Sequence, residues 1–352
     1  MTTQSYEVLD EALSMLAPYG PEFGPHGLSN HGPMASEALC AMGRHDAVLR
    51  WVEHYRTRLD QRPSHQSRID DANWRDALGK LNRVQDWSEF FKNQLADAPA
   101  PLVLDAWVAR LAPGISAAAF HGVIRVGHAM RSLAERETPA RRIELADALG
   151  YWAASYQTLP GRNDHAGGSA RPSEIIAKLA LVPPEMREGK TPTISSGLDQ
   201  LAHFAPFLDV VAKVDVSGNS DAFISDLTET FAYVYLANGR GILGAITFIH
   251  CVTGPVAVRN LAPHLSAATL QSALRYAWQA ATAIYVRYGI RPRPRSERVA
   301  SISDRDELID RAIATRDEHA IKFAEACLRE NRLNPNPAYL AAAEHSAKTL
   351  RG

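Results

Sequence analysis

Apolar residues recur at helical spacing along most of this chain. The pattern begins with Leu9, Leu13 and Leu16 in residues 4–17. Comparable stripes run through residues 46–59, 86–95, 101–111, 115–133 and 144–156. Apolar positions at i, i+3, i+4 and i+7 are typical of an α-helix that buries one face. The pattern therefore predicts an all-α fold, a single large multi-helix domain with no internal repeat.

Further helices are expected in the less regular parts of the chain. They are residues 34–39, 175–181, 198–212, 222–237, 242–258, 270–288, 305–329 and 338–350. Residues 232–235 could also form a short buried strand by propensity. The segment 242–258 is almost wholly apolar, and Gly254-Pro255 should kink or restart its helix just after His250.

Loops divide this helical series without dividing the domain. Three prolines and two glycines interrupt residues 18–25, and residues 161–171 form a glycine-rich polar loop that contains His165. Alternating arginine and proline in residues 291–295 predict a stiff linker. We therefore expect one domain over residues 1–352, with 296–352 as a C-terminal helical segment packed on it.

Composition and charge narrow the class of protein. The chain has 352 residues, of which 46% are hydrophobic and 22% charged, as in a soluble globular protein. Its net charge of -1 carries no long block of one sign, so we expect no nucleic acid as a partner. No apolar run is long enough for a membrane span, and no leader is expected at the N-terminus. Cys40, Cys251 and Cys327 lack metal-site spacing, which favours a reducing, cytoplasmic location.

Titratable groups interrupt the apolar stretch 120–129. His121, Arg125 and His128 stand at i, i+4 and i+7, so a helix would place them on one face. His121 and His128 would lie about 10 Å apart, which suits one metal ligand and one acid or base facing a substrate. Arg125 between them favours a site that handles an anionic or phenolate group. The alternative is a core helix whose polar stripe is bonded to carboxylates.

Two other segments carry histidines of the same kind. His26 and His31 flank a helix start near Pro33, and His250 lies in the apolar segment 242–258. Neutral imidazole suits iron, zinc or copper, and a buried imidazole needs a partner. Each histidine also has a simpler interpretation, because His26 could be a surface residue, His31 a helix cap and His250 a hydrogen-bonded core residue. Taken together, the three segments favour a metal.

A nucleotide fingerprint also occurs in the chain. Residues 239–244 match G-x-G-x-x-G, but after Gly244 the next acidic residue is Glu297, too far away to hold a ribose. The sequence therefore offers no convincing site for NADPH.

Five stretches carry a resemblance to a known family. They are residues 24–34, 119–128, 144–153, 248–255 and 317–323. Through them the chain resembles the questin oxidase-like family over about residues 20–345. The resemblance implies an α-helical oxygenase, since fungal members are associated with oxidative opening of anthraquinone rings. Some members look like non-haem iron enzymes with several histidine ligands and a modified lysine.

The resemblance also implies a set of site residues. It makes His26, His31, His121 and His250 the iron ligands. If the protein is such an oxygenase, we expect Arg125 and His128 to be catalytic groups that hold or deprotonate a phenol. The fungal pattern tends to have histidine and tyrosine at the positions of Arg125 and His128. Because no lysine lies between Lys213 and Lys322, the expected fifth ligand is Lys178, Lys213, His128 or water.

The sequence thus predicts an oxidoreductase of secondary metabolism. It would use dioxygen on a polycyclic phenolic or quinone substrate at non-haem iron, in Baeyer–Villiger or ring-cleaving fashion, and a homo-oligomer is compatible with the sequence. The alternative is a metal-free helical enzyme or binding protein. In that case the same histidines do acid–base or hydrogen-bonding work on a small molecule.

Overall fold

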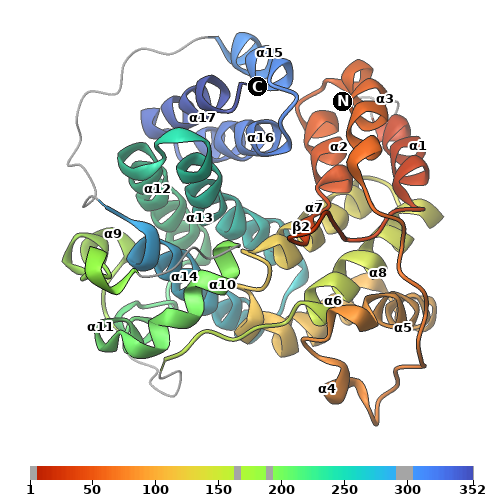
Figure 1. Cartoon of the computed structure of the whole chain (residues 1–352), viewed down its shortest axis with the longest axis horizontal. Helices are drawn as coiled ribbons and strands as arrows, with labels where there is room; N and C mark the ends of the chain where they lie inside the picture. Colours follow the sequence, from red (N-terminus) through yellow and green to blue (C-terminus); the bar gives the residue numbers. More distant parts are fainter. Residues whose placement is uncertain (1–5, 162–167, 188–192, 291–303, 352) are drawn as a thin grey trace.

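The computed structural model describes residues 6–161, 168–187, 193–290 and 304–351, and nearly all its regular structure is helical (Figure 1). The first half contains α1 (Glu7–Leu16), α2 (Gly32–Ala41), α3 (His45–Tyr55), α4 (Trp74–Ala77), α5 (Val84–Asp97), α6 (Ala100–Leu111), α7 (His121–Glu135) and α8 (Pro139–Ala154). The second half contains α9 (Pro172–Ile175), α10 (Ile194–Leu198), α11 (Ala205–Leu208), α12 (Ser220–Asn238), α13 (Gly241–Leu261), α14 (Ala267–Tyr288), α15 (Arg305–Ala314), α16 (Glu318–Leu333) and α17 (Pro337–Thr349). The predicted all-α fold is confirmed.

Strand structure is minimal in the described residues. β1 (Glu22–Phe23) pairs antiparallel with β2 (Leu28–Ser29), with Glu22 opposite Ser29. Residues 232–235, for which a strand was an alternative, lie inside α12. The same helix supplies the segment before residues 239–244, so the glycine fingerprint joins two helices and lacks the strand that a dinucleotide site requires.

Several of the expected helices are wrong in their extent, and the one expected over 175–181 is replaced by α9, which ends at Ile175, and a short 3-10 helix that ends at Lys178. The helix expected over 115–133 begins only at His121, because Ala118, Ala119 and Phe120 have positive φ. Residues 198–212 form short helical pieces, since Pro206 lacks the N–H that a continuous helix would need there and instead lies in the first turn of α11. Residues 305–329 form two helices, α15 and α16, separated at Arg316, whose φ is +59°. The break at residues 118–120 lies directly before His121, and the break at Arg316 lies three residues before His319. Both histidines belong to the site described below.

α13 passes through the centre of the molecule. Contrary to the expected restart, it continues through Pro255 to Leu261. Among the described helices it is the one long and apolar enough to cross a membrane, but 67% of its most apolar window is buried inside the protein. This burial is that of a core helix.

The core consists of two hydrophobic clusters. The larger joins residues of α5–α8 to residues of α12–α14, and the smaller joins α1–α3 to Ile309 of α15 and Ile321 and Ala324 of α16. α2 and α16 contribute side chains to both, with Met34 and Phe323 in the larger cluster. Helices α1–α3 and α15–α17 accordingly lie at one end of the molecule (Figure 1). Part of the C-terminal segment expected over 296–352, residues 296–303, lies outside the described residues, as do His165 and the linker 291–295.

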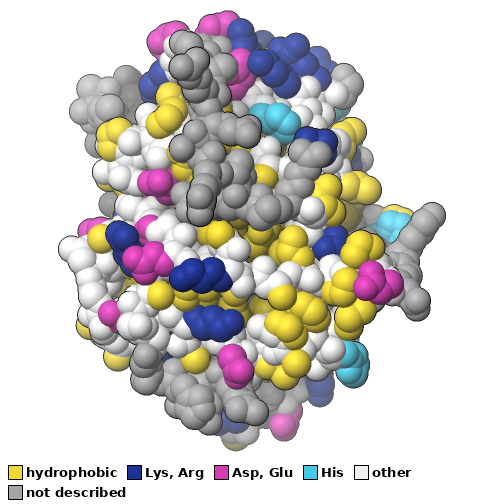
Figure 2. Space-filling model, turned by 90° about the vertical axis from the view of Figure 1, so that its left-hand side faces the viewer, with side chains coloured by type: hydrophobic (Ala, Val, Ile, Leu, Met, Phe, Trp, Pro, Cys, Tyr) yellow, Lys and Arg dark blue, Asp and Glu magenta, His cyan; other side chains and the backbone are white. Residues whose placement is uncertain are grey.

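Surface charges are mixed. On the face drawn in Figure 2, positive and negative side chains are interspersed among hydrophobic ones, and neither sign covers the face.

Candidate metal centre

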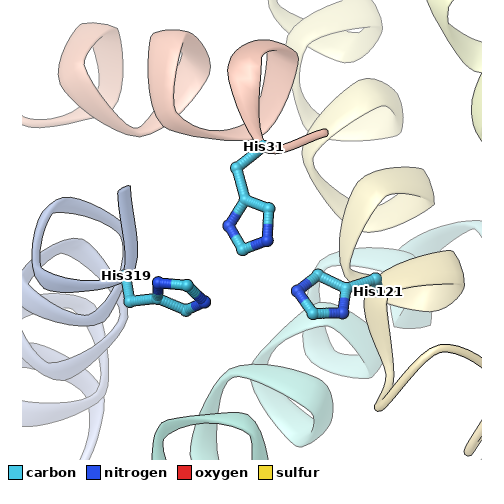
Figure 3. A group of neighbouring side chains, drawn as sticks. All are labelled: His31, His121 and His319. Atoms are coloured by element: carbon cyan, nitrogen blue, oxygen red, sulfur yellow. The ribbon is translucent and has the colours of Figure 1, made fainter. Parts of the chain in front are cut away.

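Four buried histidines meet where α2, α7, α13 and α16 come together. His31 directly precedes α2, His121 is the first residue of α7, His250 lies within α13, and His319 is the second residue of α16. A ring nitrogen of each of His31, His121 and His319 lies within 4.8 Å of those of the other two, and Figure 3 shows the three rings converging from three helices. The fourth ring is close to them, because the Nε2 atoms of His121 and His250 are 3.1 Å apart. We call His31, His121, His250 and His319 the histidine cluster.

Short-range contacts fix the direction of the two rings whose Nε2 atoms face each other. The Nδ1 atom of His121 is hydrogen-bonded to the carbonyl oxygen of Ala118, and the Nδ1 atom of His250 lies 2.7 Å from the carbonyl oxygen of Ile246. A carbonyl oxygen can only accept, so each Nδ1 carries the proton and each Nε2 carries a lone pair. Two lone pairs therefore face each other at 3.1 Å with no proton between them. A cation bound to both nitrogens removes this conflict.

The distances and donors fit a metal ion. Two nitrogens that bind one ion at about 2.1 Å and about 90° apart lie about 3.0 Å from each other. His31 adds a buried Nδ1 atom that has no hydrogen-bond partner in the described part of the chain. Metal-binding histidines commonly donate their other ring N–H to a backbone carbonyl, as His121 and His250 do. The cluster thus fits a metal that prefers nitrogen ligands.

Burial keeps three of these imidazoles neutral. It lowers the pKa values of His31, His121 and His250 well below their usual range, and the neighbouring histidines and Lys322 contribute to this lowering. A neutral imidazole has the lone pair that a metal requires.

Lys322 lies one turn beyond His319 on α16 and is only 2% exposed. Its Nζ atom lies 4.0 Å from the sulfur of Met34, and no carboxylate is within salt-bridge distance of it among the described residues. Burial lowers the pKa of Lys322 to about 7, although Glu318 and Asp317 act in the opposite direction. Lys322 is therefore an amine that loses its proton near neutral pH beside the histidine cluster.

A set of contacts from α3 and the 3-10 helix that follows it, residues 56–58, holds two of the histidines in place. The hydroxyl of Tyr55 accepts a hydrogen bond of 2.7 Å from the backbone N–H of His31. Arg58 lies over the Tyr55 ring and donates to both carboxylate oxygens of Glu318, the residue before His319, at 2.9 Å. Trp51 stacks on Tyr55 and donates to the carbonyl oxygen of Arg316. The beginnings of α2 and α16 are thereby joined through one helix.

The structure brings together three of the four predicted ligands. His31, His121 and His250 are in the cluster, whereas His26 is exposed in the turn between β1 and β2. His319 completes the cluster instead. Of the lysines considered as a fifth ligand, Lys178 and Lys213 are both exposed, and Lys322 is the buried lysine near the histidines.

Arg125 and His128 are each bonded to a buried carboxylate. Nε and Nη2 of Arg125 lie 2.7 and 2.8 Å from the two carboxylate oxygens of Glu144. Burial alone would lower the pKa of Arg125, but Glu144 more than offsets it and holds the pKa above its usual value. The Nδ1 atom of His128 lies 2.7 Å from Glu37. α7 therefore has a polar stripe bonded to carboxylates, which was the alternative interpretation of this stretch of the sequence.

Two small cavities lie beside this stripe. One, of about 20 Å³, is lined by residues that include Arg62, Ser88, Arg125 and Asp147. The other, of about 10 Å³, is lined by residues that include Glu37, His128 and Glu144. Each has room for about one water molecule, and none of the four histidines lines either of them.

Comparison with protein families places most of the chain in one family. The family model described as questin oxidase-like matches residues 28–327, which is most of the chain. The chain belongs to the questin oxidase-like family. All four histidines of the cluster and Lys322 fall within the matched residues, whereas His26 does not. No curated protein matches the chain. Membership of the questin oxidase-like family indicates an oxygenase, and the buried histidines could hold its metal.

Sequence reasoning missed His319 and Lys322 because it placed both in the middle of one long helix, 305–329. Two signals could have located the break. Asp317 has the residue type preferred at a helix N-cap, and residues 317–323 belong to the stretches that resemble the family.

Proposed function

We propose that this protein is an oxygenase whose non-haem iron is held by His31, His121, His250 and His319. The observation that supports this best is the pair of Nε2 atoms of His121 and His250, which face each other at 3.1 Å in a buried site while both Nδ1 atoms are bonded to backbone carbonyls. Family membership supports iron and dioxygen as the chemistry. When bound, iron supplies the one-electron chemistry that allows dioxygen to react with an organic molecule.

The protein contributes position and exclusion of water. His31, His121 and His250 present neutral nitrogen donors, because burial lowers their pKa values well below the usual range. We assign Lys322 as the fifth group of the centre because it is buried one turn from His319. As a free amine it is a further nitrogen donor, and as an ammonium it is a proton donor.

The proposed substrate is a polycyclic phenol or quinone, as the resemblance to the family implies, and the proposed setting is secondary metabolism in the cytoplasm. In this proposal Arg125 and His128 act as positioning groups of α7, because Glu144 and Glu37 occupy their side chains. Baeyer–Villiger oxygenation and ring cleavage are both compatible with it, and so is a homo-oligomer.

Elemental analysis of protein purified without chelators tests the proposal. We expect about one iron per chain in the wild type and a loss of iron in the double variant His121→Ala, His250→Ala, whose folding is checked by circular dichroism. A folded double variant that retains the iron of the wild type would contradict this site. A wild type that takes up no iron, even on addition of ferrous iron, would favour the metal-free alternative.

A further inference from the structure

The backbone directly before His121 adopts a conformation that L-residues rarely take. Ala118, Ala119 and Phe120 have φ values of +46°, +54° and +71°, and none of them is glycine. In this left-handed region the Cβ atom crowds the following carbonyl oxygen, so such residues normally occur singly. Three in succession persist only where the surrounding structure holds them.

This left-handed turn controls the direction of the His121 ring. It turns the carbonyl of Ala118 towards His121, where the oxygen accepts from the backbone N–H at 3.2 Å and also from Nδ1 of the ring. The turn thereby fixes which nitrogen carries the proton, and it directs the other nitrogen, Nε2, towards His250.

A close contact between Phe120 and α13 holds the turn. Phe120 is fully buried, and its ring lies where a side chain at Gly254 would be. A Cβ atom added to Gly254 would lie 2.5 Å from Cδ1 and 2.6 Å from Cγ of Phe120. Gly254 follows His250 by one helical turn. The contact therefore joins the residue before one histidine to the helix that carries the other.

We propose that the contact between Phe120 and Gly254 is the positioning device that sets His121 against His250, so that the affinity and geometry of the metal centre depend on it. This proposal rests on the metal site proposed above. Phe120 and Gly254 are positioning residues, because they act through the two histidines.

A pair of glycine variants tests this role with Co²⁺ as a spectroscopic probe. Gly254→Ala pushes against the Phe120 ring. Gly127→Ala is the matched control, because its Cβ atom would lie 2.9 Å from Cβ of Ala257 and so overpacks the same pair of helices nearly two turns from His121. We expect both variants to unfold at lower temperature than the wild type. Only Gly254→Ala should weaken Co²⁺ binding, by at least tenfold, and change the visible absorption spectrum of the bound Co²⁺.

Phe120→Leu provides a second route if Gly254→Ala does not fold. It removes the ring instead of displacing it, and we expect the same loss of affinity and a changed spectrum. Equal Co²⁺ affinity and an unchanged spectrum in the folded variants would overturn the inference, and so would an equal loss of affinity in Gly127→Ala. If the wild type itself binds no Co²⁺, the proposed metal site fails, which is a separate result from either of these.

Discussion

At the scale of single residues, the histidine cluster is a costly arrangement unless something binds it. A buried polar group without a partner costs about 1–3 kcal/mol. His31 Nδ1 is such a group, and the facing Nε2 atoms of His121 and His250 cannot satisfy each other while both Nδ1 protons are donated to carbonyls. Perturbed, buried titratable groups of this kind gather at functional sites. The cluster is therefore better explained by a ligand than by core packing.

His319 and His26 give the sharpest test of which histidines bind the metal. We expect His319→Ala to lower iron affinity by at least about 100-fold, because loss of a ligand should exceed the 10- to 100-fold effect of losing an outer partner. His26→Ala should leave affinity unchanged, since His26 is exposed and lies outside the cluster. Titration with ferrous iron under anaerobic conditions measures both. A large loss of iron affinity in His26→Ala, with none in His319→Ala, would contradict the cluster and favour the ligand set expected from the sequence.

The buried carboxylate of Glu37 gives a prediction for acid stability. Burial alone would raise the pKa of Glu37, but Arg131 and the hydrogen bond from His128 lower it to about 2. Its ordinary value is 4.5, so its stabilising contribution is complete above pH 4.5 and disappears as the pH falls towards 2.

Glu37→Gln should therefore destabilise the protein by about 3 kcal/mol at pH 7, as when one partner of a buried ion pair is removed. The difference from the wild type should shrink steadily between pH 4.5 and pH 2. Urea unfolding across this range measures it. A difference that stays constant with pH would mean that the Glu37 charge is not the cause.

At the scale of elements, the positions of the histidines follow from where helices begin. α7 begins directly after three left-handed residues, and α16 begins two residues after Arg316, which is also left-handed. Asp317 caps α16, its carboxylate accepting from the backbone N–H groups of His319 and Ala320 at 2.8 and 3.2 Å. Because the two helices begin at these positions, the side chains of His121 and His319 both point into the histidine cluster.

The effect of the α16 cap on metal binding can be distinguished from its effect on the stability of the protein. Asp317→Ala should cost about 1 kcal/mol in unfolding free energy, the usual value for a lost N-cap, and should weaken iron binding by roughly tenfold. Ser266→Ala removes the corresponding cap of α14, which carries none of the four histidines, and should cost a similar amount without affecting iron. Urea unfolding and iron titration of both variants provide the comparison. Equal iron affinity in the two variants would mean that the cap does not position His319.

The helices themselves could be predicted from sequence, because apolar residues at helical spacing indicate both a helix and the face that it buries. α1, α5 and α6 were located within a few residues in this way. The breaks at Ala118–Phe120 and Arg316 could not, because alanine, phenylalanine and arginine carry no local preference for left-handed backbone. Tertiary contacts, such as that of Phe120 with Gly254, impose this conformation. The candidate site was therefore predicted where it lies inside or at the start of a recognisable helix, at His31, His121 and His250, and was missed at His319.

At the scale of the whole molecule, the histidine cluster joins distant parts of the chain. Its members run from position 31 to position 319, and α2 and α16 lie between the two hydrophobic clusters. A metal bound by all four side chains would cross-link the N-terminal helices to the C-terminal ones. Ligands that bind only the folded state stabilise it by about 2.7 kcal/mol at 100 times their dissociation constant.

Metal removal should therefore lower thermal stability. We expect the wild type, stripped of metal by a chelator that is then removed, to unfold about 5 °C or more below the protein reloaded with ferrous iron, as measured by calorimetry. The double variant His250→Ala, His319→Ala should show no such shift. An equal shift in that variant would place the stabilising metal elsewhere.

The central claim is that His31, His121, His250 and His319 hold one iron ion, and anomalous diffraction at the iron absorption edge tests it most directly. In crystals of protein purified without chelators, the claim predicts a single strong anomalous peak within about 2.2 Å of a nitrogen of each of these four histidines. A map with no peak at the histidine cluster, in crystals soaked with ferrous iron under anaerobic conditions, would contradict it.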